Sequence, residues 1–144
     1  MSARSLYRSS AVLFVLFAAG HTFGFLRFRP TSPDALAVRD AMTNVHFRVG
    51  HASFTYGGFY TGFGLYITLY MLFSALLSWQ LGDLAMSAPQ SVRTLSWIFF
   101  GVQVAGLILS MVYFSAAPAV LSGLVAAFLG WSALKTNARM APAT

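Results

Sequence analysis

Residues 52–82 read ASFTYGGFYTGFGLYITLYMLFSALLSWQLG and contain no Asp, Glu, Lys or Arg. A helix that crosses the hydrocarbon core of a bilayer needs about 20 consecutive, mostly apolar residues, so this stretch is long enough to span. Three further charge-free stretches, 9–26, 94–113 and 115–134, are of similar character. The sequence therefore predicts an all-α, integral membrane four-helix bundle with spans near residues 9–27, 53–80, 94–114 and 117–135. A short polar connector is expected over residues 81–93.

The composition agrees with a membrane location. Apolar residues make up 58% of the chain and charged residues 8%, whereas a soluble domain carries about 25% charged residues. The length suits a single domain, 1–144, and the net charge of +6 comes mainly from arginines near the predicted helix ends. Basic residues there set topology and contact lipid headgroups, so we expect the bilayer as a partner and no nucleic acid. The absence of cysteine excludes disulfides and Cys-ligated metals.

The first span begins with a basic segment that contains Arg4 and Arg8. Such a start also resembles a signal peptide cleaved before His21, but the apolar run continues to Leu26, which favours an uncleaved helix. Four spans place both termini on one side of the membrane. The basic residues expected on that side are Arg4, Arg8, Arg93, Lys135 and Arg139, against Arg27, Arg29, Arg39 and Arg48 in the first loop. This small excess favours cytoplasmic termini.

The first loop carries the pattern of an amphipathic helix. Ser32-Pro33-Asp34 is a typical helix start, because it supplies a capping hydroxyl, a proline for the first turn and an acid near the N-terminus. Apolar residues then recur every three or four positions, at Ala35, Val38, Met42, Val45 and Val49. We expect a helix over 33–49 that lies on the outer membrane surface or caps the bundle and stops at Gly50. A solvated loop is the alternative.

Small residues are expected to hold the bundle together, because helices in lipid gain little from burying apolar side chains. One face of the third span and one face of the fourth carry small or polar residues at heptad spacing. They are Ser96, Phe99, Gln103, Gly106, Ser110 and Tyr113, and Ala116, Ala119, Gly123, Ala126, Gly130 and Ala133. Two GxxxG pairs, Gly20/Gly24 and Gly58/Gly62, predict that the first two spans touch through their glycines near the first loop.

Three histidines are candidates for chemistry. His21 lies within the first span, and an ionisable residue inside a membrane helix usually faces the interior and has a function. A neutral His21 bonded to a carbonyl or hydroxyl across the bundle is the alternative. His46 and His51 are five residues apart, so on one helix they do not share a face as zinc ligands four apart do. Since the chain also has no Glu to complete a carboxylate site, we expect no metal and no other cofactor.

Polar residues gather in the half of the predicted bundle nearest the first loop. With the loop they predict a cationic, phenol-rich pocket for an anionic headgroup, a quinone or a carboxylate ligand. The candidate ligand-binding residues are His21, Arg39, His46, Arg48, His51, Tyr60, Gln103 and Tyr113. For Gln103, in the middle of the third span, a cross-helix hydrogen bond that fixes register is the alternative role. No nucleophile with a nearby base is visible, so no catalytic residue is predicted.

Three segments resemble a group of small bacterial membrane proteins with four predicted helices. They are Ala19-Gly20-His21-Thr22-Phe23-Gly24; Arg39-Asp40-Ala41-Met42 with Val45-His46-Phe47; and Phe59-Tyr60-Thr61-Gly62-Phe63-Gly64-Leu65. The resemblance covers most of the chain and implies this architecture, an inner-membrane location and a role for His21, but it points to no known chemistry. It also implies an aromatic residue and an acid before the Phe-Tyr pair. This chain has Gly57-Gly58 there, so a shared site that depended on the acid would be lost or altered.

Two functions are compatible with these features. The first is a non-enzymatic membrane protein that binds a small ligand or lipid, or that serves as a partner or assembly factor for another membrane protein. The alternative is a membrane enzyme or redox module that uses His21, His46 and His51 with a metal, haem or quinone. A stoichiometric metal or a Soret band in the absorption spectrum of the purified protein would select the alternative.

Overall fold

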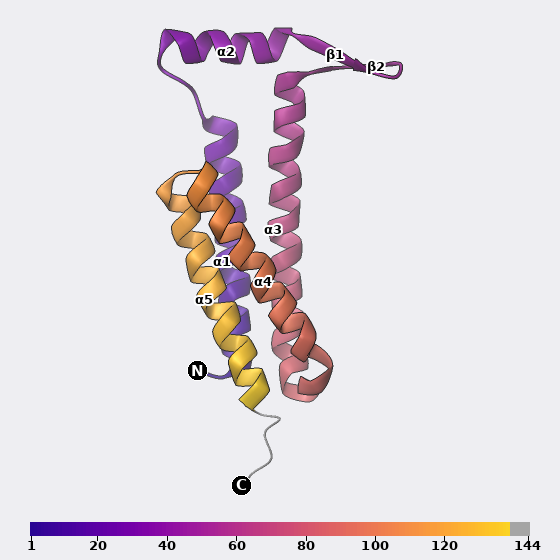
Figure 1. Cartoon of the computed structure of the whole chain (residues 1–144), viewed down its shortest axis with the longest axis vertical. Coiled ribbons are helices and arrows are strands. Elements are labelled where there is room, and N and C mark those ends of the chain that lie inside the picture. The colour runs from indigo at the N-terminus through magenta and orange to yellow at the C-terminus, as the bar shows by residue number, and fades with distance from the viewer. Residues whose placement is uncertain (139–144) are drawn as a thin grey trace. The chain divides into compact units, whose positions relative to one another are not determined.

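The computed structural model describes residues 1–138 as five helices and one β-hairpin. The four long helices are α1 (Ala3–Arg27), α3 (Tyr56–Ser87), α4 (Pro89–Tyr113) and α5 (Ala116–Ala138), and each is long and apolar enough to cross a membrane. The short elements are α2 (Pro33–Asn44), β1 (His46–Val49) and β2 (Ala52–Thr55) (Figure 1). The all-α, four-span architecture is thus confirmed. Arg139, counted above among the basic residues, lies outside the described residues.

The contacts of the chain divide it into two compact units. Unit 1 consists of residues 1–17 and of the chain from residue 71 onward, so it holds the start of α1, the end of α3, and both α4 and α5. Unit 2 consists of residues 18–70 and holds the end of α1, α2, the hairpin and the start of α3. Parts of α1 and α3 therefore belong to each unit.

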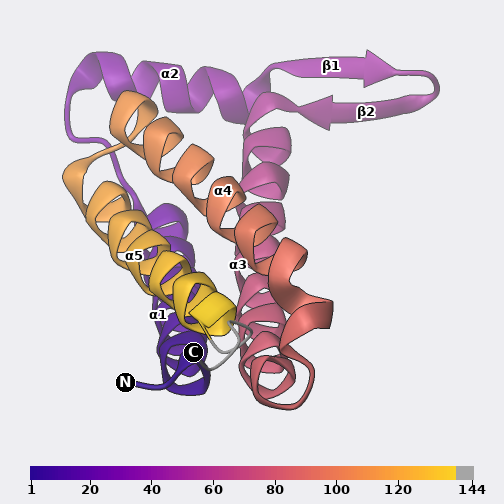
Figure 2. The same cartoon turned by 60° about the horizontal axis from the view of Figure 1, so that its bottom comes forward.

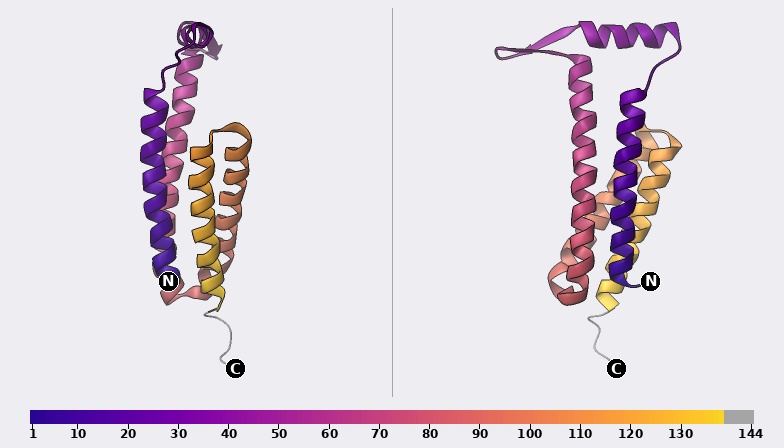
Figure 3. Two further views of the ribbon diagram at one scale, coloured as in Figure 1. Left: turned by 90° about the vertical axis from the view of Figure 1, so that its left-hand side faces the viewer. Right: turned by 180° about the vertical axis from the view of Figure 1, so that it is seen from behind.

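Unit 1 is a four-helix bundle with one core. The buried core residues come from all four helices and include Tyr7, Leu81, Phe99 and Leu129. Helices α4 and α5 run antiparallel side by side (Figure 3). The predicted faces are largely confirmed. Of those residues, Ser96, Phe99, Gln103 and Ser110 of α4 and Ala126, Gly130 and Ala133 of α5 are buried.

The helices of unit 1 extend beyond the charge-free stretches. Helix α1 begins at Ala3 and α3 continues to Ser87, so Arg4, Arg8 and Asp83 all lie on helices. The prediction of a polar connector over 81–93 is wrong, because only residue 88 separates α3 from α4. Charged side chains near the end of a membrane helix reach the interface without ending the helix, which explains the extra turns.

Unit 2 corrects the prediction for the first loop. The amphipathic helix begins at Pro33 as expected, and its first turn is capped by the Ser32 hydroxyl. However, α2 ends at Asn44, and residues 46–49, expected to continue it, form β1. This strand pairs with β2 in an antiparallel hairpin (Figure 2), so residues 53–55, expected to begin the second span, belong to β2 instead. Gly50 lies in the hairpin turn with a φ of 61°, a left-handed conformation that glycine adopts without steric cost. Gly50 therefore reverses a strand instead of ending a helix.

The predicted contact between the GxxxG glycines is wrong. A Cβ built at Gly20, Gly24 or Gly62 meets no atom within 4 Å. The close approach occurs at Gly64 of α3, where a Cβ would lie 2.6 and 2.7 Å from the two Cε atoms of Phe25 on α1. An aromatic ring packed on a single glycine, rather than two glycines packed on each other, brings these helices together.

We predict that Gly64→Ala destabilises the protein. The added methyl group collides with the Phe25 ring, and overpacking typically costs about 1–3 kcal/mol. Gly20→Ala is the matched control: its Cβ has open space, and Ala is about 1 kcal/mol more favourable than Gly within a helix. Thermal unfolding of both variants in one detergent measures the difference. An unchanged midpoint for Gly64→Ala would contradict the packing described here.

Candidate functional site

His21 connects the end of α1 to α3 within unit 2. Its side chain is half-buried, and its Nε2–H donates to the carbonyl oxygen of Gly64 at 3.1 Å. The same carbonyl accepts a hydrogen bond from the Thr68 hydroxyl at 3.2 Å. Thr22, beside His21 in the chain, shares a 2.8 Å hydrogen bond with Thr68. This arrangement matches the alternative in which His21 bonds to a carbonyl of another helix.

Aromatic rings extend this contact. The imidazole of His21 stacks in parallel with Phe25, with ring centres 5.7 Å apart, and Phe25 meets the ring of Tyr60 at 5.4 Å. Because Phe25 also fills the space over Gly64, one ring positions both the histidine and the tyrosine. Tyr60 is 60% exposed, so it remains accessible from outside the unit.

The β-hairpin has a polar face. In its register His46 pairs with Thr55, and Arg48 pairs with Ser53. Alternate residues of a strand point to the same side of a sheet, so these four side chains share one face. His46 and Arg48 are exposed, as is His51 in the turn. The Nδ1–H of His46 donates to the carbonyl oxygen of the last residue of α2 at 2.9 Å, which orients the imidazole ring.

The opposite face of the hairpin is apolar and joins α3. Phe47 pairs with Phe54 across the strands, and their ring centres are 6.0 Å apart. Phe47 also contacts Tyr56 and Phe59 at the start of α3, with ring-centre distances of 4.9 and 5.7 Å. These contacts fix the hairpin on α3 by its apolar face and leave the polar face turned away from the aromatic cluster.

The eight predicted ligand-binding residues are divided between the units. Gln103 and Tyr113 belong to unit 1, and the other six belong to unit 2. Gln103 is buried on α4, whereas Tyr113, the last residue of that helix, is 73% exposed. None of the hydrogen bonds within residues 18–70 joins His21 to α2 or the hairpin.

The redox alternative has no supporting contact within residues 1–138. No three side chains among the described His, Asp and Glu residues lie close enough together to hold a metal ion. The hydrogen bond of His21 goes to a backbone carbonyl, and that of His46 goes to another. Use of these histidines with a metal, haem or quinone therefore stays a prediction.

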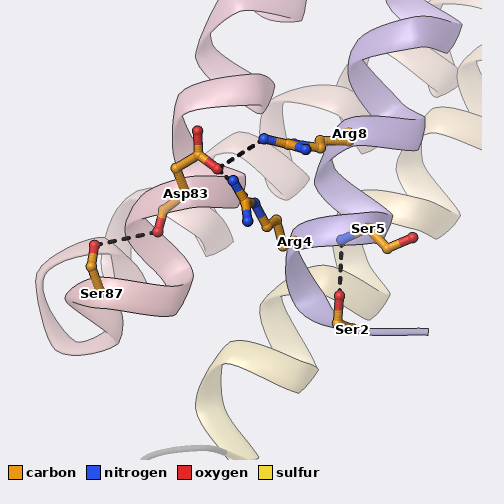
Figure 4. A network of polar contacts seen from close by, with 6 residues as sticks. All are labelled: Ser2, Arg4, Ser5, Arg8, Asp83 and Ser87. Atoms are coloured by element: carbon orange, nitrogen blue, oxygen red, sulfur yellow. Dashed lines mark hydrogen bonds and ion pairs between the residues drawn. The ribbon is translucent and has the colours of Figure 1, made fainter.

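Unit 1 contains a charged cluster that the sequence pattern did not reveal. One carboxylate oxygen of Asp83 on α3 accepts from Arg4 at 2.8 Å and from Arg8 at 3.3 Å (Figure 4). The guanidinium of Arg8 also lies over the Trp79 ring, 4.5 Å from its centre. Two features of the sequence could have indicated this cluster. Arg4 and Arg8 are one helical turn apart, and Asp83 is the single acid outside the first loop.

Tyr7, one turn along α1 from Arg4, ties three helices of unit 1 together. Its hydroxyl donates to Ser96 of α4 at 2.6 Å, and its carbonyl oxygen accepts from Ser78 of α3 at 2.8 Å. A Cβ at Gly82 would lie 3.2 Å from the Cβ of Tyr7, so α3 also approaches α1 closely here. The charged cluster therefore lies on a rigidly packed part of the bundle.

Comparisons with protein-family models, with curated proteins and with solved structures gave no match to this chain. The three segments that carry the resemblance, 19–24, 39–47 and 59–65, all lie in unit 2. The first contains His21 and the third contains Gly64, so these motifs include the donor and the acceptor of the cross-helix hydrogen bond.

We predict that His21→Gln is mild and His21→Leu is not. Glutamine keeps an N–H donor for the Gly64 carbonyl, so its stability should stay within about 0.5 kcal/mol of the wild type, which is the scale of weak effects. Leucine removes the donor, and a lost hydrogen bond costs about 0.5–1.5 kcal/mol. Thermal unfolding in detergent compares the two variants. If they are equally destabilised, the hydrogen bond is not what His21 contributes.

Proposed function

We propose that this is a non-enzymatic, multi-pass protein of a bacterial inner membrane that binds a small anionic ligand or lipid headgroup through α2 and the β-hairpin. The observation that carries the proposal is the polar hairpin face, where His46 and Arg48 lie beside the hydroxyls of Ser53 and Thr55. Arginine offers five N–H donors in a fork that matches phosphate and carboxylate oxygens. Residues 46–55 include no acidic side chain, so this surface favours anions.

Helix α2 extends this surface. Arg39 is exposed on α2, and the ion pairs found among residues 1–138 involve neither Arg39 nor Arg48. Within unit 2, α2 and the hairpin lie across the start of α3 (Figures 1 and 2), where this candidate span leaves the membrane. Exposed Val38 and Val49 suit the boundary between headgroups and acyl chains.

The proposal assigns different roles to the candidate residues. Arg39, His46, Arg48 and His51 make the ligand contacts, because they are exposed on α2 and the hairpin. His21 lies on α1 and Tyr60 lies on α3, and the Phe25 ring packs against both of their rings. Gln103 and Tyr113 belong to unit 1, so they are not part of the surface formed by α2 and the hairpin. A partner membrane protein with an acidic surface would meet the same exposed groups.

The binding proposal predicts that glycerol 3-phosphate, a headgroup phosphate without acyl chains, shifts the imidazole NMR signals of His46 and His51. The signal of His21 serves as an internal reference. Arg48→Gln should weaken the affinity about tenfold, because a hydrogen bond to a charged group contributes roughly 1.5–3 kcal/mol. Arg29→Gln removes the same charge from the loop outside the hairpin and should leave the affinity unchanged. Equal losses in both variants would indicate general charge attraction and refute the site.

The proposed orientation has cytoplasmic termini, with α2 and the hairpin outside. It is supported by the four candidate spans and by unit 1, in which the first turn of α1 and the last turn of α5 lie at the same end (Figure 3). We expect a reporter fused after Thr144 to be active only in its cytoplasmic form, and one inserted at Asp40 only in its periplasmic form. A periplasmic signal at Thr144 would reverse the orientation and leave the four spans intact.

A further inference from the structure

A cleft in unit 1 lies beside the first turns of α1, and its lining includes none of the residues assigned to the hairpin surface. It has a volume of about 600 Å³, which falls within the roughly 300–1,000 Å³ usual for small-molecule pockets. It is lined by Ser2, Arg4, Ser5, Arg8, Ser9, Val12 and Leu13, and by Phe128 of α5. The polar residues of this lining are two arginines and three serines, so the cleft suits an anion.

Both arginines keep hydrogen-bonding capacity for such an anion. Asp83 is not part of the lining, and it accepts one hydrogen bond from each guanidinium through a single oxygen. Each guanidinium carries five N–H donors, so donors remain after this pairing. Two positive side chains and one negative side chain leave the cluster with a charge of +1. A phosphodiester, with one negative charge, would neutralise it.

The lining changes from polar to apolar along α1. Arg4 and Leu13 are about 13 Å apart along the helix axis, at a rise of 1.5 Å per residue. The headgroup layers add about 5–8 Å on each side of the hydrocarbon core. The arginines and serines therefore fall in the headgroup layer when Val12, Leu13 and Phe128 lie in hydrocarbon. This order of polarity along the membrane normal is that of a phospholipid.

We propose that this cleft binds one anionic phospholipid. The phosphodiester accepts from N–H groups of Arg4 and Arg8 that Asp83 leaves free, and one acyl chain follows Val12, Leu13 and Phe128. Figure 4 shows the two arginines extended toward Asp83, whereas the Ser5 side chain points to the other flank of α1, so we assign the headgroup contacts to the arginines alone. A soluble phosphate ester shares the phosphate chemistry and lacks the chain, which allows the two ligands to be distinguished.

Native mass spectrometry of the full-length protein in a non-ionic detergent tests the ligand. The probes are dioleoyl phosphatidylglycerol, dioleoyl phosphatidylcholine and glycerol 3-phosphate. We expect one bound phosphatidylglycerol with an affinity at least about tenfold above that for phosphatidylcholine, because one charge-assisted contact is worth that factor. Equal affinity for the two lipids would overturn the assignment of an anionic ligand. Glycerol 3-phosphate that binds as tightly as the lipid would overturn the assignment of a phospholipid.

Three variants test the location. Arg8→Gln should weaken phosphatidylglycerol binding about tenfold or more. Because Arg8 also contacts Asp83 and Trp79, Ser5→Leu gives an independent test: it fills part of the cleft with an apolar side chain and leaves the ion pairs intact. Arg93→Gln, the matched control, removes an exposed positive charge at the start of α4, outside the cleft. Wild-type binding by Ser5→Leu, or equal losses in Arg8→Gln and Arg93→Gln, would overturn the site.

Discussion

Helices that lie in lipid gain little from burying apolar side chains against one another, so close packing and polar contacts have to hold them together. In this protein two hydrogen bonds from side chains to backbone carbonyls connect α1 to α3. Ser78 of α3 donates to the carbonyl of Tyr7 in unit 1, and His21 of α1 donates to the carbonyl of Gly64 in unit 2. A glycine of α3 makes room for α1 in both places: Gly82 faces Cβ of Tyr7, and Gly64 faces the ring of Phe25.

The absence of charge located the four spans because a charged side chain at the centre of a bilayer is costly. The same criterion misplaced the helix ends, since Arg4, Arg8 and Asp83 lie near the interface and pair with one another. The hairpin was missed for a different reason. The sequence around Val45 and Val49 fits a helical stripe and also alternates as a strand does, and β-branched residues favour the strand.

Sequence patterns identified residues of the candidate site, but they did not predict which groups those residues contact. An ionisable residue inside a span singled out His21, but its acceptor is a backbone carbonyl, which every position in the chain offers. The polar hairpin face follows from strand alternation, so it became visible only after residues 46–49 proved to be a strand. Arg4 and Asp83 are 79 residues apart in the chain; their pairing depends on the packing of α1 on α3, which no local pattern encodes.

Gly57 and Gly58 stand where the resemblance implies an aromatic residue and an acid, and the structure gives both positions a physical reading. The N–H of Gly58 donates to the Thr55 hydroxyl at 3.0 Å, so Thr55 caps α3, and Gly58 is the third residue after the cap, where an acid completes a capping box. An acid at residue 58 would stabilise the first turn of α3 by about 0.3–1 kcal/mol. At Gly57 a Cβ would lie 3.1 Å from the carbonyl oxygen of Met42, so an aromatic side chain would displace the end of α2. Gly57 thus lets the end of α2 approach the start of α3 closely, while the contacts of Phe47 with Tyr56 and Phe59 hold the apolar face of the hairpin against α3.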